Sequence, residues 1–379
     1  MDKTPSTDTL SASENSLPLF WPLAGVAAAI EAGEDLVARN AAFALEAEKI
    51  DYDLRAEFAT PNQIRLDLHT LRLRDFTVNA AAGEIPTLVD APFAGHTAVI
   101  ADYHRGQSLV ETLLGNGLTQ VCVTDWKSAT PEMKDYDIDH YLAELNVCID
   151  DLGGKVNLVG LCQGGWMSAM LAARFPHKVN TLVLAGAPID TAAGDGPIKR
   201  MALETPTEVY AQLVELGGGV MKGRFMLQGW KNMHPEQQYL RKYIDLWEHV
   251  DDPAYLSKTE TFERWYESTV DLPGRWYMQA IVQLFKENRF ARGEFVGLGR
   301  KLDLHDVRCP VYLLAGESDD ITTKEQVFDA RKYLGTPPAQ ISSQLVPGGH
   351  IGLFMGSHTL RDYWPGIARW IASGGQPAA

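Results

Sequence analysis

A glycine-flanked cysteine at the end of a short apolar run is the feature that most restricts the fold of this chain. Residues 156–160 have the composition of a buried strand, and Gly160-Leu-Cys162-Gln-Gly164 follows, with small residues continuing in a helical pattern. This is the G-x-S-x-G pattern of a nucleophile on a tight strand-to-helix turn, with cysteine in place of serine. The flanking glycines leave room for the turn, and the helix N-terminus favours a thiolate. The pattern predicts a nucleophilic Cys162, with a tight turn around an inert buried cysteine as the alternative.

The order of strand and helix patterns predicts an α/β fold. Helical patterns over residues 137–151 and 164–174 separate several short apolar runs that we expect to be strands. Unbroken apolar strands that alternate with helices indicate a mostly parallel sheet covered on both faces. Earlier in the chain, residues 64–74 alternate apolar and polar, which predicts one half-exposed antiparallel strand. The apolar runs are Thr97–Ile100, Gln120–Thr124, Val156–Gly160, Thr181–Ala185 and Val311–Ala315.

An acid and a base follow the cysteine in the chain order expected for this type of site, which is nucleophile, acid, base. Asp319 comes just after the apolar run that ends at residue 315, and His350 lies in a Gly-Gly loop after a last short strand. We therefore predict a triad of Cys162, Asp319 and His350. Asp320 either assists or is only solvated, and Glu317 is less suitable because it is closer to the strand end.

Two backbone amides are expected to stabilise an oxyanion at this site. The amide of Gln163 directly follows the nucleophile, and the amide of Phe93 or Ala94 lies in the loop after an early strand. His96 in the same loop is more simply a loop or pocket residue, since the triad already has its base. The mechanism expected is attack of the Cys162 thiolate on an ester or thioester, followed by transfer of the acyl group to water, an alcohol or a thiol.

The chain is expected to have four parts. Residues 1–16 have the composition of a disordered tail, and residues 17–50 that of an N-terminal helical segment. This segment either packs on the body of the protein or touches an apolar surface. Residues 51–190 and 305–379 form the α/β core. Residues 191–304, rich in large aromatic side chains, form a helical cap insertion that roofs a pocket or is an ordinary helical subdomain.

Composition limits the partners and the compartment. Lys plus Arg number 34 and Asp plus Glu number 49, a net charge of −15, so nucleic-acid binding is not expected. The four cysteines have no metal-binding spacing and form no disulfide framework, so a reducing cytoplasm is the predicted location. The uncharged run Leu17–Ile30 is too short to span a bilayer and lacks the basic start of a signal peptide.

On these motifs the chain resembles the polyhydroxyalkanoate synthase and intracellular polyhydroxybutyrate depolymerase superfamily, which has an α/β-hydrolase fold and a cysteine nucleophile. The elbow Gly160–Gly165 and the segments 303–310 and 347–352 resemble the shorter, two-subunit class of synthases. The segments 91–96, 123–126, 186–190, 226–236, 276–289 and 319–322 resemble the depolymerases. Two positions depart from the family: Gly164 stands where depolymerases tend to have proline, and Asp320 where synthases tend to have histidine.

The resemblance implies the same triad of Cys162, Asp319 and His350, and a substrate that is a polyester of 3-hydroxy acids or its coenzyme A thioester. It implies no metal and no bound cofactor, with coenzyme A as co-substrate or product. We expect the substrate pocket to include five residues, His96, Trp126, Trp166, Asp320 and Ile351.

The leading functional prediction is depolymerisation of polyhydroxyalkanoate by hydrolysis or thiolysis through acyl-Cys162. The alternatives are a polyhydroxyalkanoate synthase, a small-molecule esterase or acyltransferase, and a non-catalytic granule-binding protein. Association with polyhydroxyalkanoate granules and formation of a homo-oligomer are left open.

Overall fold

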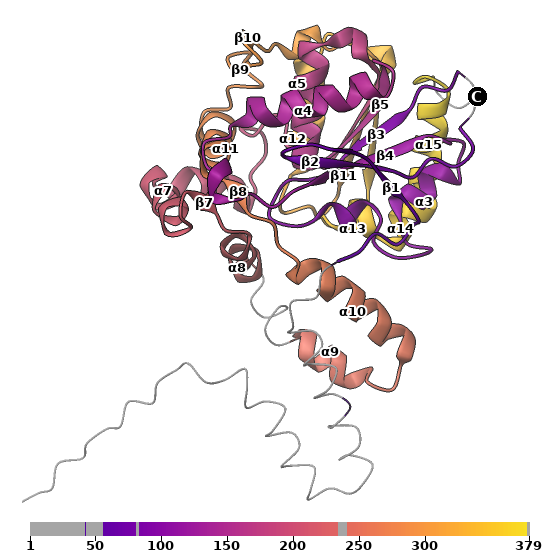
Figure 1. Cartoon of the computed structure of the whole chain (residues 1–379), viewed down its shortest axis with the longest axis vertical. Helices are drawn as coiled ribbons and strands as arrows, with labels where there is room; N and C mark the ends of the chain where they lie inside the picture. Colours follow the sequence, from indigo (N-terminus) through magenta and orange to yellow (C-terminus); the bar gives the residue numbers. More distant parts are fainter. Residues whose placement is uncertain (1–41, 43–55, 81–82, 234–240, 377–379) are drawn as a thin grey trace, which may run out of the picture. The chain divides into compact units, whose positions relative to one another are not determined.

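A computed structural model describes residue 42 and residues 56–80, 83–233 and 241–376 (Figure 1). The predicted tail 1–16 and the helical segment 17–50, apart from Ala42, lie outside the described residues. The chain divides into two compact units, one of residues 1–53 and 233–263 and the other of residues 54–232 and 264–379. All the predicted site residues belong to the second unit.

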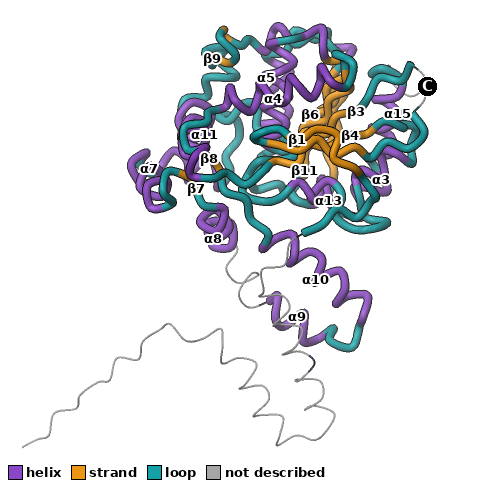
Figure 2. Tube along the Cα trace, viewed as in Figure 1, coloured by secondary structure: helices purple, strands orange, loops and turns teal. Residues whose placement is uncertain are grey.

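An eight-stranded sheet is the centre of the second unit (Figure 2). Its order is β1-β2-β4-β3-β5-β6-β11-β12, and every neighbouring pair from β4 to β12 is parallel. β1 and β2 add an antiparallel edge. The strands are β1 (Gln63–Asp67), β2 (Leu71–Asp75), β3 (Thr87–Asp90), β4 (Val121–Trp126), β5 (Val156–Leu161), β6 (Val179–Ala185), β11 (Val311–Gly316) and β12 (Ile341–Val346).

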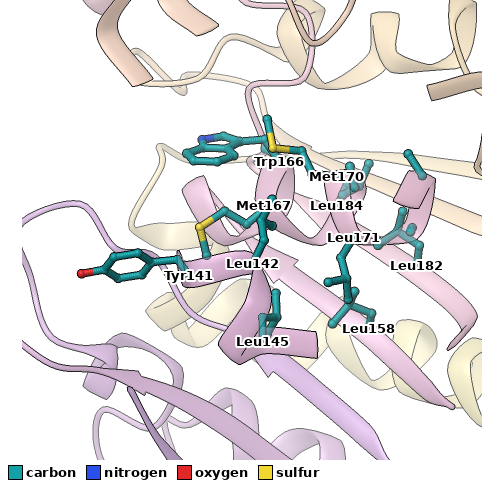
Figure 3. Packing of buried hydrophobic residues seen from close by; sticks show 14 of the residues in the cluster. Tyr141, Leu142, Leu145, Leu158, Trp166, Met167, Met170, Leu171, Leu182 and Leu184 are labelled. Atoms are coloured by element: carbon teal, nitrogen blue, oxygen red, sulfur yellow. The ribbon is translucent and has the colours of Figure 1, made fainter. Parts of the chain in front are cut away.

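Helices cover both faces of this sheet, as the alternation of patterns predicted (Figure 1). On one face, α4 (Ile138–Asp151) and α5 (Gln163–Arg174) pack on β5 and β6, and Figure 3 shows the leucine and methionine side chains between them. On the other face lie α3 (Leu109–Leu114), α14 (Ser357–Asp362) and α15 (Trp364–Ala372). β5 is buried at every residue, as its continuous apolar sequence requires.

Two strand predictions were wrong. Residues 64–74 form a hairpin and not one strand, because the chain turns at residues 68–70, where the Leu68 amide donates to the Leu71 carbonyl. This turn contains no glycine or proline, and its only sign in the sequence is the adjacent polar pair His69 and Thr70, which shifts the alternation by one residue. The run Thr97–Ile100 is a 3₁₀ helix, Ala98–Ala101, and the strand lies earlier, at β3. A short, fully buried apolar run does not distinguish strand from helix.

The chain between β6 and β11 is mainly helical. Within the second unit it contains a π-helical turn at Ala280–Lys286 and two pairs of two-residue strands, which the sequence pattern did not predict. In the first unit, Lys242 and Glu263 form a buried ion pair of 2.6 Å. The predicted limits of the cap, residues 191 and 304, stay a prediction. The helices are α6 (Pro197–Glu204), α7 (Thr207–Leu216), α8 (Gly223–Met233), α9 (Lys242–Glu248), α10 (Pro253–Glu267) and α11 (Gly274–Gln279).

No helix in the described part of the chain is both long enough and apolar enough to cross a bilayer.

Candidate active site

Cys162 lies at a sharp turn between β5 and α5. Its φ of 52° and ψ of −116° are values that side chains other than glycine rarely adopt, so its backbone is strained. The turn is fixed because the Cys162 amide donates to the Ala185 carbonyl at 2.8 Å, and the Cys162 carbonyl accepts from the Gly165 amide at 2.9 Å. Cys162 is therefore held at the N-terminus of α5, where the helix dipole and free amides favour a negative charge.

The glycines around Cys162 are required by close contacts. A Cβ on Gly160 would lie 2.5 Å from the Cα of Gly165, and a Cβ on Gly164 would lie 2.1 Å from the Asp90 carbonyl oxygen. Gly165 is equally restricted, because its Cβ would lie 2.3 Å from that of Ala187. The contacts at Gly160 and Gly164 agree with the expectation that the glycines flanking Cys162 leave room for the tight turn. The third follows from the packing of α5 on the end of β6.

Asp319 and His350 form a buried pair at the carboxyl edge of the sheet. Asp319 follows β11, His350 follows β12, and these two strands are neighbours. His350 Nδ1 lies 2.7 Å from Asp319 Oδ2, and the two side chains are 8% and 0% exposed. The other carboxylate oxygen accepts from the amides of Ile321 at 3.0 Å and Thr322 at 2.8 Å. These bonds orient the carboxylate, so that it fixes the position of the imidazole ring.

The surroundings of His350 change its pKa. Burial lowers the pKa of His350, but the negative charges of Asp319 and Cys162 and hydrogen bonds to both raise it well above its usual value. The structure thus brings the three predicted triad residues together: the imidazole is hydrogen-bonded to the Asp319 carboxylate, and Cys162 is near enough to raise the pKa of the imidazole. In chemical terms, this is a nucleophile, a base and a group that orients the base.

Both predicted oxyanion donors lie on segments next to the elbow. Gln163 is the first residue of α5, and the first amides of a helix have no partner one turn earlier. The loop that carries Phe93 begins at Asp90, whose carbonyl lies against Gly164. The structure therefore places the two segments side by side. The role of the Gln163 and Phe93 amides stays a prediction.

An aromatic cluster surrounds the side chain of Phe93. Phe93 stacks on Tyr141 at 4.9 Å between ring centroids, and it contacts Trp126 and Trp276 at 5.9 and 5.2 Å. Trp166, one turn after the nucleophile on α5, extends the cluster through Trp276 at 5.7 Å. All five rings are at most 3% exposed. Trp126 and Trp166, predicted as pocket residues, are thus core residues beside the elbow, and their contact with substrate stays a prediction.

The other predicted pocket residues lie in three loops. His96 is half-buried and stacks on Trp265 and Tyr266, and burial lowers its pKa to about 4, a hydrogen bond to the Tyr266 backbone opposing this. Its ring is therefore neutral at pH 7. Asp320 and Ile351 are half-buried and directly follow Asp319 and His350.

Sequence reasoning missed two residues that shape this site. Gly186 directly follows β6 with a φ of 55°, and a Cβ there would lie 3.2 Å from Cε1 of His350. Asp90 is fully buried beneath the elbow. The one sequence signal for this residue is its position at the end of a short apolar run.

Among the described residues there is no cluster of His, Cys, Asp and Glu side chains that could hold a metal ion. The four cysteines are free thiols in the structure.

The sheet order, the elbow and the positions of the acid and the histidine define an α/β-hydrolase fold, as predicted. A solved carboxylesterase from Nitrososphaera gargenis has the same fold, with a TM-score of 0.50, 15% identity, and coverage of 83% of this chain and 99% of that chain. A family model described as "Protein of unknown function (DUF3141)" matches residues 77–336, and the chain belongs to this family.

The chain is also similar to curated proteins named "Poly(3-hydroxyalkanoate) polymerase subunit PhaC". It is 27% identical over 323 residues to the one from Haloferax mediterranei, covering 83% of this chain and 64% of that protein, just under two thirds of its length. It is 28% identical over 299 residues to the one from Synechocystis, covering 75% of each. The resemblance to the polyhydroxyalkanoate superfamily, predicted from the motifs, is confirmed.

Proposed function

We propose that this protein transfers 3-hydroxyacyl groups through a thioester on Cys162, with a polyhydroxyalkanoate as the polymeric substrate or product. The observation that carries the proposal is the 2.7 Å contact between His350 Nδ1 and Asp319 Oδ2, combined with a cysteine on a strained elbow that raises the pKa of the same imidazole.

The reaction follows from these contacts. His350 takes the thiol proton, and the Cys162 sulfur attacks the carbonyl carbon of the ester or thioester. The amides of Gln163 and Phe93 stabilise the resulting oxyanion. Its collapse breaks the bond to the leaving alcohol or thiol, which takes the proton from His350, and leaves acyl-Cys162. His350 then deprotonates the acceptor, and the acceptor oxygen or sulfur displaces Cys162. Asp319 orients and stabilises the imidazolium at each stage.

The acceptor decides the direction of the reaction. The relatives named polymerase subunits favour synthesis, in which the donor is a 3-hydroxyacyl-coenzyme A and the acceptor is the terminal hydroxyl of the growing chain. Depolymerisation is the second candidate, and it rests on the segments of the sequence that resemble depolymerases, such as Ala91–His96. In that direction the donor is the polyester, and the acceptor is water or coenzyme A. The same triad serves both directions.

Two parallel assays on the full chain test the proposal. In one, 3-hydroxybutyryl-coenzyme A is supplied, and free coenzyme A and insoluble polymer are measured. In the other, amorphous polyhydroxybutyrate granules are supplied with and without coenzyme A, and soluble 3-hydroxy acids and their thioesters are measured. Polymer growth establishes synthesis, and soluble products establish depolymerisation. Cys162→Ala should abolish either activity, with Cys309→Ala as the matched control.

Activity that persists in Cys162→Ala would contradict the site. Granule binding without turnover by the unaltered chain would instead favour a binding protein.

A further inference from the structure

A buried carboxyl group lies under the elbow and outside the triad. Asp90, the last residue of β3, is 0% exposed. The Ser168 hydroxyl on α5 donates to its Oδ2 at 3.1 Å, and the Thr124 hydroxyl on β4 donates to its Oδ1 at 3.2 Å. Ser168 and Thr124 are also 0% exposed. The carboxyl group thus connects two neighbouring strands to the helix that begins directly after Cys162.

The hydrogen bonds around this carboxyl group extend to the start of the loop that carries Phe93. The Ala91 amide donates to the Thr124 hydroxyl oxygen at 2.9 Å, and Trp126 Nε1 donates to the Ala91 carbonyl at 2.9 Å. The Asp90 carbonyl itself lies against Gly164 on the first turn of α5. The first peptide of the loop is therefore held from both sides by groups that contact Asp90.

We propose that Asp90 is a positioning residue, which ties the loop of the second oxyanion donor to the helix that carries Cys162. The inference rests on the proposed function, since it assigns Asp90 a role in the same acyl-transfer site. Removal of a single oxyanion donor slows acyl transfer by about 10²–10³-fold, and a displacement of about 1 Å can have a comparable effect. A loop released from Asp90 should therefore slow the reaction with no change in the nucleophile.

The surroundings of Asp90 favour its neutral acid form. Burial raises the pKa of the carboxyl well above its usual value, and the hydrogen bonds from Ser168, Thr124 and Trp126 only partly oppose this. Within the described residues, Asp90 also raises the pKa of the buried Cys148 thiol on α4, and no cation is among the groups that shift the pKa of Asp90. When the acid carries its own proton, one of the hydroxyl bonds reverses, because hydroxyl hydrogens rotate.

Because the pKa of Asp90 is raised on folding, the stability linked to its protonation is present at low pH. It is lost as the pH rises from the unfolded value, about 3.9, through the raised folded pKa. Asp90→Asn has the shape of the neutral acid and does not ionise. Its melting temperature should match that of the unaltered protein near pH 4 and exceed it by a margin that grows with pH.

Asp102 supplies a matched control. It is also 0% exposed, but its carboxylate accepts three short hydrogen bonds, from the Thr60 amide at 2.7 Å, the Thr60 hydroxyl at 2.8 Å and the Ser108 hydroxyl at 2.6 Å. In Asp102→Asn an NH₂ group replaces one carboxylate oxygen, and it would face these donors without being able to accept a hydrogen bond from them. This variant should lower the melting temperature at neutral pH, in contrast to Asp90→Asn.

The test compares Asp90→Asn with Asp90→Leu, which keeps the branching of the side chain and removes the hydrogen bonds. Thr124→Val and Ser168→Ala are added in case the larger leucine side chain prevents folding. Three quantities are measured: kcat and KM for the substrate turned over, the rate of Cys162 alkylation by iodoacetamide, and hydrogen exchange of the loop 91–96.

We expect Asp90→Asn to keep at least about a third of kcat. Asp90→Leu or Thr124→Val should lose about 10–100-fold in kcat, with KM and alkylation unchanged, because alkylation needs no oxyanion donor.

Faster hydrogen exchange of the loop in Asp90→Leu or Thr124→Val, but not in Asp90→Asn, supports the positioning role of Asp90. This readout does not depend on activity. If the unaltered protein has no turnover, only the proposed function is overturned. Unchanged exchange of the loop in these variants overturns the role of Asp90. An equal loss of kcat in the asparagine and leucine variants, or an equal loss of alkylation and kcat, also overturns it.

Discussion

The carbonyl oxygen of Asp90 and the Cα of Gly164 are so close that a Cβ on Gly164 would lie 2.1 Å from that oxygen. The contact joins the end of β3 to the first turn of α5, and backbone atoms form both sides of it. No side-chain rotation can relieve a collision at this point.

Gly164→Ala should therefore destabilise the protein strongly, by about 2–4 kcal/mol, or displace the elbow. Gly366 in α15 is exposed, and a Cβ added there would have no other atom within 4 Å, so Gly366→Ala should stabilise by up to about 1 kcal/mol. Urea unfolding of both variants measures the difference. Equal stabilities would show that the close approach of β3 and α5 is absent in solution.

The strained backbone at Cys162 gives a second prediction. Cys162→Gly and Cys162→Ala both remove the thiol and should both be inactive. A φ of 52° with a ψ of −116° suits glycine, so the glycine variant should be the more stable of the two by about 1 kcal/mol. Thermal unfolding compares them directly. A more stable alanine variant would mean that the elbow is not strained.

The third prediction concerns the charge pair. Asp319→Asn removes the negative charge that raises the pKa of His350, so this pKa should fall, as measured by NMR titration of the imidazole. Because the folded pKa is raised, the stability from the pair is fully present below the unfolded value of about 6.5. It is lost as the pH rises through the folded pKa. Asp319→Asn should therefore melt at a lower temperature than the unaltered protein at low pH, and this difference should become smaller as the pH rises.

Asp320→Asn is the control for this pair, because Asp320 is not among the groups that shift the pKa of His350. It should leave that pKa unchanged. The reverse result, with Asp320→Asn alone lowering the pKa, would reassign the acid of the triad to Asp320.

The fourth prediction concerns Tyr141, whose buried hydroxyl has no hydrogen-bond partner among the residues described. An unsatisfied buried hydroxyl costs about 1–3 kcal/mol, so Tyr141→Phe should leave stability unchanged or raise it by about 1 kcal/mol. Tyr210 is the comparison, since its hydroxyl donates to the Met201 carbonyl at 3.1 Å. Tyr210→Phe should lower stability by about 0.5–1.5 kcal/mol. A larger loss at Tyr141 would reveal a partner for its hydroxyl.

The parts of the fold that could be predicted from the sequence are those with a strong local pattern. The helices over residues 138–151 and 163–174 and the strands at 156–161 and 311–316 are close to their predicted limits. The two strands are nearly continuous apolar runs of the length typical of a buried strand, and the two helices are longer segments with apolar residues at helical spacing. The predictions for the hairpin at residues 63–75 and the 3₁₀ helix at residues 98–101 were wrong, because tertiary contacts decide whether such short runs form a turn, a strand or a helix.

The candidate site divides in the same way. The sequence alone determined that residues 160–164 form a tight turn around Cys162, since only glycine fits where backbones come close, and it determined the order of nucleophile, acid and base. Only the tertiary structure decided that Asp319 is hydrogen-bonded to His350 and that Asp90 lies under the elbow. Residues far apart in the chain make these contacts because β11 pairs with β12 and β3 with β5. The pairing of strands depends on how the whole core packs, and no local pattern encodes it.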